Sequence, residues 1–205
     1  MTESDRPVSP VALKAPRVLA RSAQGAIVVA AGVEVLRALT LRAHRLHPAD
    51  TTSGRAALVS MVSAYAMTVA AALFLVWFHR CRRNARVITP GADLGSDVWA
   101  VVAWLIPLVN AWFPRGLLLS ARRASSADPA SAGRDDALVN AWWVAWAGHL
   151  VIAAIGLSGT SLAVLVISQA LNLTAAALVI VVIHRVTATQ THSLATPRID
   201  VMPAV

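Results

Sequence analysis

The chain contains little charge and a single cysteine. Charged residues make up 14% of its 205 residues, and only ten residues are acidic, whereas hydrophobic residues make up 57%. Soluble domains carry about 25% charged residues, so this composition excludes an ordinary soluble domain. Cys81 has no second cysteine to pair with. It therefore forms no disulfide within the chain and gives no information about the redox compartment.

Recognisable active-site patterns are also missing. We find no arrangement of an acid, a base and a nucleophile, and no nucleotide-binding motif. His79 and Cys81 stand two positions apart and do not share a helix face, so together with His184 they do not indicate a zinc site. The sequence therefore predicts no enzyme activity, no cofactor and no metal.

The net charge of +8 raises the question of nucleic acid. The basic residues flank the apolar blocks, however, where the positive-inside bias and the anionic headgroups of lipids account for them. We therefore predict that the chain binds a lipid bilayer and not a nucleic acid. Residues 1–21, which are polar and contain three prolines, and residues 185–205 are predicted to be disordered tails.

The apolar residues form blocks long enough to cross a membrane. A hydrocarbon core about 30 Å thick needs about 20 helical residues. The blocks are continuously apolar instead of alternating, which favours helices over the strands of a barrel. The sequence predicts an all-α integral membrane domain over residues 22–184, with four transmembrane helices and a proline-broken re-entrant or interfacial segment. The four spans are expected at residues 22–41, 56–78, 138–157 and 161–183.

The proline-broken segment, residues 98–114, decides the predicted topology. As a helix its apolar part would reach only about 24 Å, and Pro107 removes an amide donor and clashes with the preceding turn. If the segment crosses, giving five spans, Lys and Arg divide into eight inside and nine outside; if it returns, fourteen lie inside and three outside. The positive-inside rule favours the second arrangement, with both termini cytoplasmic. The residues of the predicted helix break are Pro107, Asn110, Trp112 and Pro114.

Three motifs resemble a known family. They are the stretch from Trp77 to Ala85, the stretch Trp-Leu-Ile-Pro-Leu-Val-Asn-Ala-Trp-Phe-Pro from Trp104 to Pro114, and the tryptophan cluster of residues 142–146. Together they are similar to the bacterial membrane family named domain of unknown function 4328, over roughly residues 56–183. The resemblance implies a multi-pass protein of the bacterial inner membrane with no assigned activity.

Several polar residues lie inside the predicted spans. Glu34 and Arg37 are three positions apart and share a helix face, so they either neutralise each other or mark a proton or ion path. His149 is expected to be neutral and to hydrogen bond to a neighbouring helix. Gln169 and Asn172 share a face of the last span, where they form contacts between helices or line a path for a solute.

Basic residues follow the second span, which ends in Trp77 and Phe78, as an interfacial aromatic belt does. Four arginines at this position are expected to contact anionic lipid headgroups: Arg80, Arg82, Arg83 and Arg86.

The function that these observations favour is a non-enzymatic membrane protein that acts through lipids or protein partners. The alternative is a small transporter or channel subunit in which Glu34, Asn110, Gln169 and Asn172 line a path for an ion or small solute. The sequence leaves open whether the partner is a second copy of the chain or another membrane protein.

Overall fold

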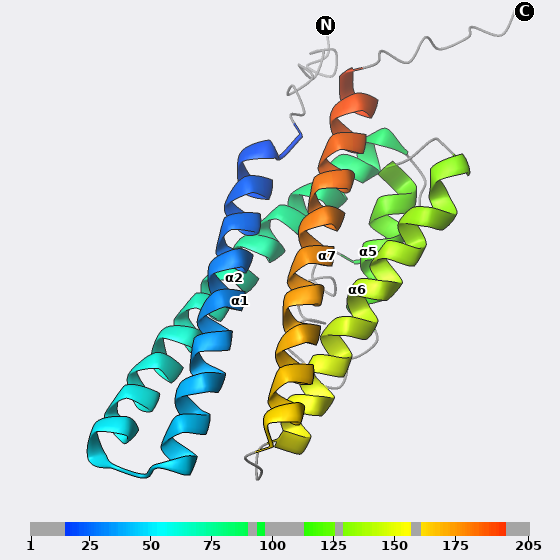
Figure 1. The fold of residues 1–205 in the computed structure, drawn as a ribbon. Coiled ribbons are helices and arrows are strands. Elements are labelled where there is room, and N and C mark those ends of the chain that lie inside the picture. The colour runs from blue at the N-terminus through cyan, green and yellow to red at the C-terminus, as the bar shows by residue number, and fades with distance from the viewer. Residues whose placement is uncertain (1–14, 90–93, 97–112, 126–128, 157–160, 196–205) are drawn as a thin grey trace, which may run out of the picture.

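The structure, a computed structural model, describes residues 15–89, 94–96, 113–125, 129–156 and 161–195. These residues form five α-helices: α1 Arg17–Leu46, α2 Asp50–Ile88, α5 Phe113–Ser125, α6 Pro129–Ile155 and α7 Leu162–Ala195. Helices α1 and α2 form one antiparallel hairpin and α6 and α7 lie beside it as a second antiparallel pair, while the shorter α5 packs against α2, α6 and α7 (Figure 1).

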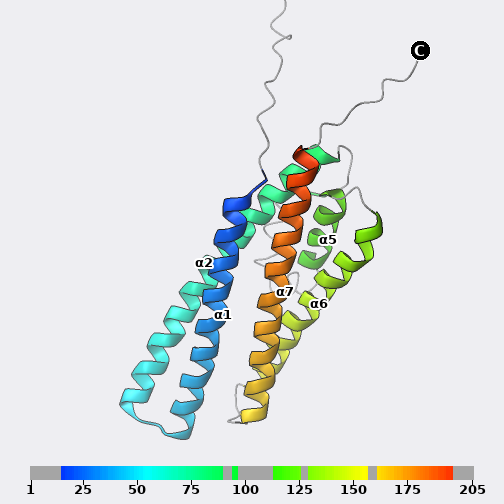
Figure 2. The same cartoon turned by 45° about the horizontal axis from the view of Figure 1, so that its top comes forward.

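The beginning of α1 and the end of α7 lie at the same end of the bundle (Figure 2). The side chain of Arg17 donates a hydrogen bond to the Thr191 hydroxyl over 3.4 Å, which joins the two helix ends directly. Because α2 also ends there and α6 begins there, the opposite end carries the α1–α2 turn and the start of α7.

Prolines mark where the first two helices end. His47 and Thr89, the residues that follow α1 and α2, have φ and ψ values of −135° and 76° and of −130° and 85°. Each of them precedes a proline, Pro48 or Pro90. A residue before proline is disfavoured in the helical region because the proline ring clashes with its backbone. Neither helix can therefore continue past these positions.

Prolines also stand where two helices begin. Pro114 is the second residue of α5 and Pro129 is the first residue of α6. The first helical turn has no partner for its amide groups, so a residue without an amide hydrogen is tolerated there. Residues 129–133 are therefore already helical.

An aromatic cluster forms the centre of the core. Phe74 lies 5.5 Å from Trp77, 6.2 Å from Phe78 and 6.4 Å from Trp142, measured between ring centroids. Trp77 and Phe78 are buried, so the expectation that they form an interfacial belt is wrong. The indole nitrogen of Trp77 donates to the Thr187 hydroxyl over 3.1 Å, which satisfies its one polar atom inside the core.

The last helix is longer than predicted. It continues to Ala195, so residues 185–195 are helical and not a disordered tail. The continuation is explained by burial, because Val186, Thr187 and Gln190 pack inside the bundle at helical spacing. Similarly, α1 begins at Arg17, five residues before the predicted start of the first span.

Three of the described helices are long and apolar enough to cross a membrane: α2, the part of α6 from Gly133 to Ile155, and α7. The predicted first span, α1, is not among them, and it carries Glu34 and Arg37 in its middle. Large apolar side chains are exposed along the three helices, for example Leu58, Val69, Val151 and Val166. Such a surface is unfavourable in water and suits a lipid environment.

Replacing Phe74 by alanine tests the aromatic core. Phe74 is 7% exposed, and its loss removes contacts with three aromatic rings, so we expect unfolding in detergent micelles to become easier by about 3–5 kcal/mol. The control is Val76→Ala, because Val76 is 53% exposed on the same helix. Equal destabilisation by the two variants would contradict the assignment of the core.

Candidate functional site

The arginines are distributed unequally between the two ends of the bundle. We call the end where α2 finishes and α6 starts the basic end, because it carries Arg17, Arg21, Arg80, Arg82, Arg83, Arg86, Arg122, Arg123, Arg134 and Arg185. The opposite end carries Arg42, Arg45 and Arg55.

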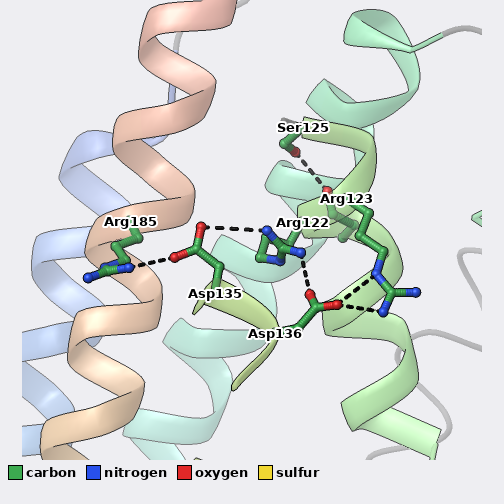
Figure 3. Close-up of polar contacts among 7 residues, drawn as sticks. Arg122, Arg123, Ser125, Asp135, Asp136 and Arg185 are labelled. Atoms are coloured by element: carbon green, nitrogen blue, oxygen red, sulfur yellow. Dashed lines mark hydrogen bonds and ion pairs between the residues drawn. The ribbon is translucent and has the colours of Figure 1, made fainter. Parts of the chain in front are cut away.

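Two aspartates at the start of α6 hold the basic end together (Figure 3). Asp135 pairs with Arg185 of α7 at 2.6 Å and with Arg122 of α5 at 3.5 Å. Asp136 also pairs with Arg122, and it pairs with Arg123 at 2.6 Å. The two carboxylates therefore link three helices.

The two α5 arginines of this network differ in their surroundings. The side chain of Arg122 is 6% exposed, whereas that of Arg123 is 62% exposed. Asp136 holds the pKa of the Arg123 guanidinium above its ordinary value, first through their hydrogen bond and second through charge attraction. Arg122 is charged and buried, so its two carboxylate partners compensate for the water that it has lost.

A second polar cluster lies beside the network, and the sequence did not predict it. Gln190 of α7 is fully buried; it donates to the Cys81 carbonyl over 2.8 Å and to the Ser125 hydroxyl over 3.0 Å. It also accepts a hydrogen bond from the Asn84 amide over 3.2 Å. The sequence pattern that could have predicted the burial of Gln190 is its helical spacing: it stands four residues after Val186 and so lies on the same buried face of α7.

The four arginines predicted to contact lipid headgroups separate into two groups. Arg82 is fully buried and donates to the carbonyls of Leu94 and Gly95, so the prediction is wrong for this residue. Arg83 and Arg86 are exposed and Arg80 is half-buried, although Arg86 also donates to the Gly95 carbonyl over 2.8 Å.

Gly95, whose carbonyl accepts from both Arg82 and Arg86, has a left-handed backbone conformation. Its φ is 63°, in the left-handed region that favours glycine. Arg82 and Arg86, one turn apart on α2, both donate to the Gly95 carbonyl. The two arginines attach residues 94–96 to the end of α2.

Glu34 and Arg37 form an ion pair inside the bundle, as their spacing indicated. The guanidinium of Arg37 donates two hydrogen bonds to the Glu34 carboxylate, over 2.5 and 2.7 Å. Ser63 of α2 donates a third over 3.0 Å. Because the carboxylate of Glu34 is buried and has three donors, this arrangement is that of a satisfied structural pair.

The polar residues of α6 and α7 also have partners. The Nδ1 atom of His149 lies 2.9 Å from the Ser168 carbonyl and 3.1 Å from the Ser168 hydroxyl, which is the predicted contact between helices. The Asn172 amide donates to the Ala31 carbonyl over 3.4 Å and to the Gln169 side chain over 3.5 Å. These residues join α7 to both α1 and α6.

Two cavities lie along α7. One, of about 140 Å³, lies between α1, α6 and α7, and Glu34, Arg37 and Gln169 are among the residues that line it. The other, of about 330 Å³, is mostly apolar, and Asn172 is among the residues that line it. The described residues contain no group of three or more His, Cys, Asp or Glu side chains that could hold a metal.

Most of the predicted helix break lies outside the described residues. Pro107, Asn110 and Trp112 belong to that part of the chain, and Pro114 lies in the first turn of α5.

Comparison with known proteins identifies the family. Residues 37–188 match the family described as Domain of unknown function (DUF4328). The chain belongs to this family. The match runs from Arg37 of the ion pair to residue 188 in α7. The predicted resemblance to this family is therefore confirmed. No curated protein and no solved structure matches the chain significantly.

Breaking the Arg122 pairs should destabilise the protein. In Arg122→Gln two half-buried carboxylates lose their shared buried partner, although Arg185 and Arg123 still pair with them, and we expect a loss of about 1–3 kcal/mol of stability. Arg123→Gln is the control and should have little effect, because this side chain is mostly in solvent. Thermal unfolding in detergent measures both. A stable Arg122→Gln protein would show that the network does not hold the three helices.

Proposed function

We propose that the chain is a four-span protein of the bacterial inner membrane, with both termini in the cytoplasm and residues 98–114 as a re-entrant segment. In this arrangement α1 crosses the membrane in addition to α2, α6 and α7, which makes four spans. Its mid-helix charges are compatible with a membrane because Glu34 and Arg37 neutralise each other within the protein. The basic end then faces the cytoplasm, in agreement with the positive-inside rule.

The contacts at the basic end support the re-entrant segment. Before the segment, Arg82 and Arg86 attach residues 94–96 to the end of α2. After the segment, the end of α5 is held at the same place: the Ala124 carbonyl accepts a hydrogen bond over 2.8 Å from the hydroxyl of Thr89, the residue that follows α2. The 13 residues of α5 reach about 20 Å, less than the thickness of a hydrocarbon core. A chain that leaves and returns at one end needs no further span.

The proposed role is non-enzymatic, through lipid or protein partners. The observation that carries it is the internal pairing of the polar residues: Glu34, His149, Gln169 and Asn172 bond to other groups of the bundle. Side chains that are satisfied in this way stabilise contacts between helices. On the cytoplasmic side Arg80, Arg83 and Arg86 supply the positive charge that attracts anionic headgroups.

A transporter or channel subunit is the second candidate. The cavity of about 140 Å³ favours it, because a carboxylate and an amide, from Glu34 and Gln169, stand at its wall. An ionisable residue beside an internal cavity is a common feature of ion paths in membranes.

Cysteine labelling tests the proposed topology. The native thiol is removed by Cys81→Ala, and single cysteines replace Arg83, Arg134 and Arg55, which are all exposed. A membrane-impermeant reagent applied to intact cells should label only position 55, because the other two face the cytoplasm. Labelling of position 134 from outside, with position 83 protected, would establish five spans and overturn the proposal.

A flux measurement separates the two candidate functions. In proteoliposomes with a pH gradient, wild type and Glu34→Gln should show the same background proton leak, because the pairing of Glu34 makes it a structural residue. Ser63→Ala, which removes one donor to the same carboxylate, serves as the matched control. A flux present in wild type and lost in Glu34→Gln would favour the transporter.

A further inference from the structure

The two cavities lie next to each other along α1, α6 and α7. On α1 the first is bordered by Glu34 and the second by Ala31, one helical turn away. On α7 the corresponding residues are Gln169 and Asn172, which are hydrogen bonded to each other. The polar cavity lies toward the end with Arg42 and Arg45, and the apolar cavity lies toward the middle of the bundle.

The polar cavity has a surplus of positive charge. Three arginines line it, Arg37, Arg42 and Arg45, and Glu34 is its single acidic residue. Glu34 is engaged by Arg37, and Arg45 donates to the Gly156 carbonyl over 3.1 Å. The Nε atom of Arg42 is buried and has no hydrogen-bond partner among the described residues. This Nε–H group is therefore available as a donor to an anion.

The start of α7 also borders this cavity, through Ser161, Val164 and Leu165. The amides of Val164 and Leu165 are already engaged, because they donate to the Ser161 hydroxyl over 3.5 Å and to the Ser161 carbonyl over 3.2 Å. The donors for an anion therefore come from the arginines, whose planar forks match the oxygens of a phosphate.

The apolar cavity has the properties of a binding site for a hydrocarbon chain. Its volume of about 330 Å³ lies in the range of about 300–1,000 Å³ that is usual for ligand pockets. Phe74, Trp142, Trp143 and Trp146 form one part of its wall, and Ala30 and Ala71 are among the small residues that leave the space open. It holds no charged side chain among its lining residues.

We propose that the two cavities together bind one anionic phospholipid, with the phosphate among Arg37, Arg42 and Arg45 and an acyl chain in the tryptophan-lined cavity. The proposal deepens the proposed function and rests on its membrane orientation, which puts the phosphate at the level of the outer leaflet. A phosphate alone would leave the apolar cavity unfilled, and a hydrocarbon alone would leave the buried Nε atom of Arg42 without a partner.

The experiment uses the full-length protein in a non-ionic detergent and follows tryptophan emission, since three tryptophans line the apolar cavity. Three probes are titrated: dioctanoyl phosphatidylglycerol, dioctanoylglycerol, which lacks the phosphate, and inorganic phosphate, which lacks the chains. We expect saturable binding of phosphatidylglycerol and at least tenfold weaker binding of the other two.

Two pairs of variants locate the site. Arg42→Gln should weaken phosphatidylglycerol binding about tenfold, because it removes a charge-assisted hydrogen bond, whereas Arg55→Gln at the same end should not. Ala71→Leu should weaken binding by filling the apolar cavity, whereas its neighbour Ala72→Leu, which is exposed and outside the lining, should not. Circular dichroism verifies that each variant is folded.

Three outcomes overturn the proposal. They are the absence of saturable phosphatidylglycerol binding, equal losses in Arg42→Gln and Arg55→Gln, and inorganic phosphate that binds as tightly as the lipid. The cysteine-labelling pattern tests the proposed topology independently, because it does not depend on any bound lipid. A failure of the lipid site is therefore distinguishable from a failure of the four-span arrangement.

Discussion

The arrangement of the last three helices depends on the pairing of one buried guanidinium. Arg122 is almost inaccessible to water, and Asp135 and Asp136 near the start of α6 compensate for its charge with carboxylates. An unpaired buried charge is far more costly than an exposed one, so these ion pairs stabilise the packing of α5 against the first turns of α6. Arg185 extends this link to α7. The network thereby holds three helices together at the basic end of the bundle.

Polarity then changes along the bundle in three steps. The basic end contains paired charges and the buried amide of Gln190, the middle contains aromatic rings and an apolar cavity, and the opposite end contains a smaller cavity with a surplus of arginine. Each step suits a different depth in a bilayer, from headgroups through hydrocarbon to headgroups. The same gradient suits a single bound lipid, which is itself polar at one end.

Sequence reasoning was correct where the signal is local. Apolar length predicted the membrane character of α2, α6 and α7, and three-residue spacing predicted the pair of Glu34 and Arg37. It was wrong where burial depends on distant segments. Arg82 resembles its exposed neighbour Arg83 in sequence, yet it points to carbonyls twelve and thirteen residues away. Gln190 was assigned to a tail because its partners on α2 and α5 are remote in the chain.

The sequence by itself determined that this is a helical protein with membrane-type segments and an excess of arginine, because hydrophobicity and charge are properties of short stretches of chain. It also carried the motifs that identify the family. Only the tertiary structure decided which arginines are buried and paired, and where two neighbouring cavities lie along α7. The reason is that desolvation and cavity shape arise from helices far apart in the sequence, and no local pattern contains them.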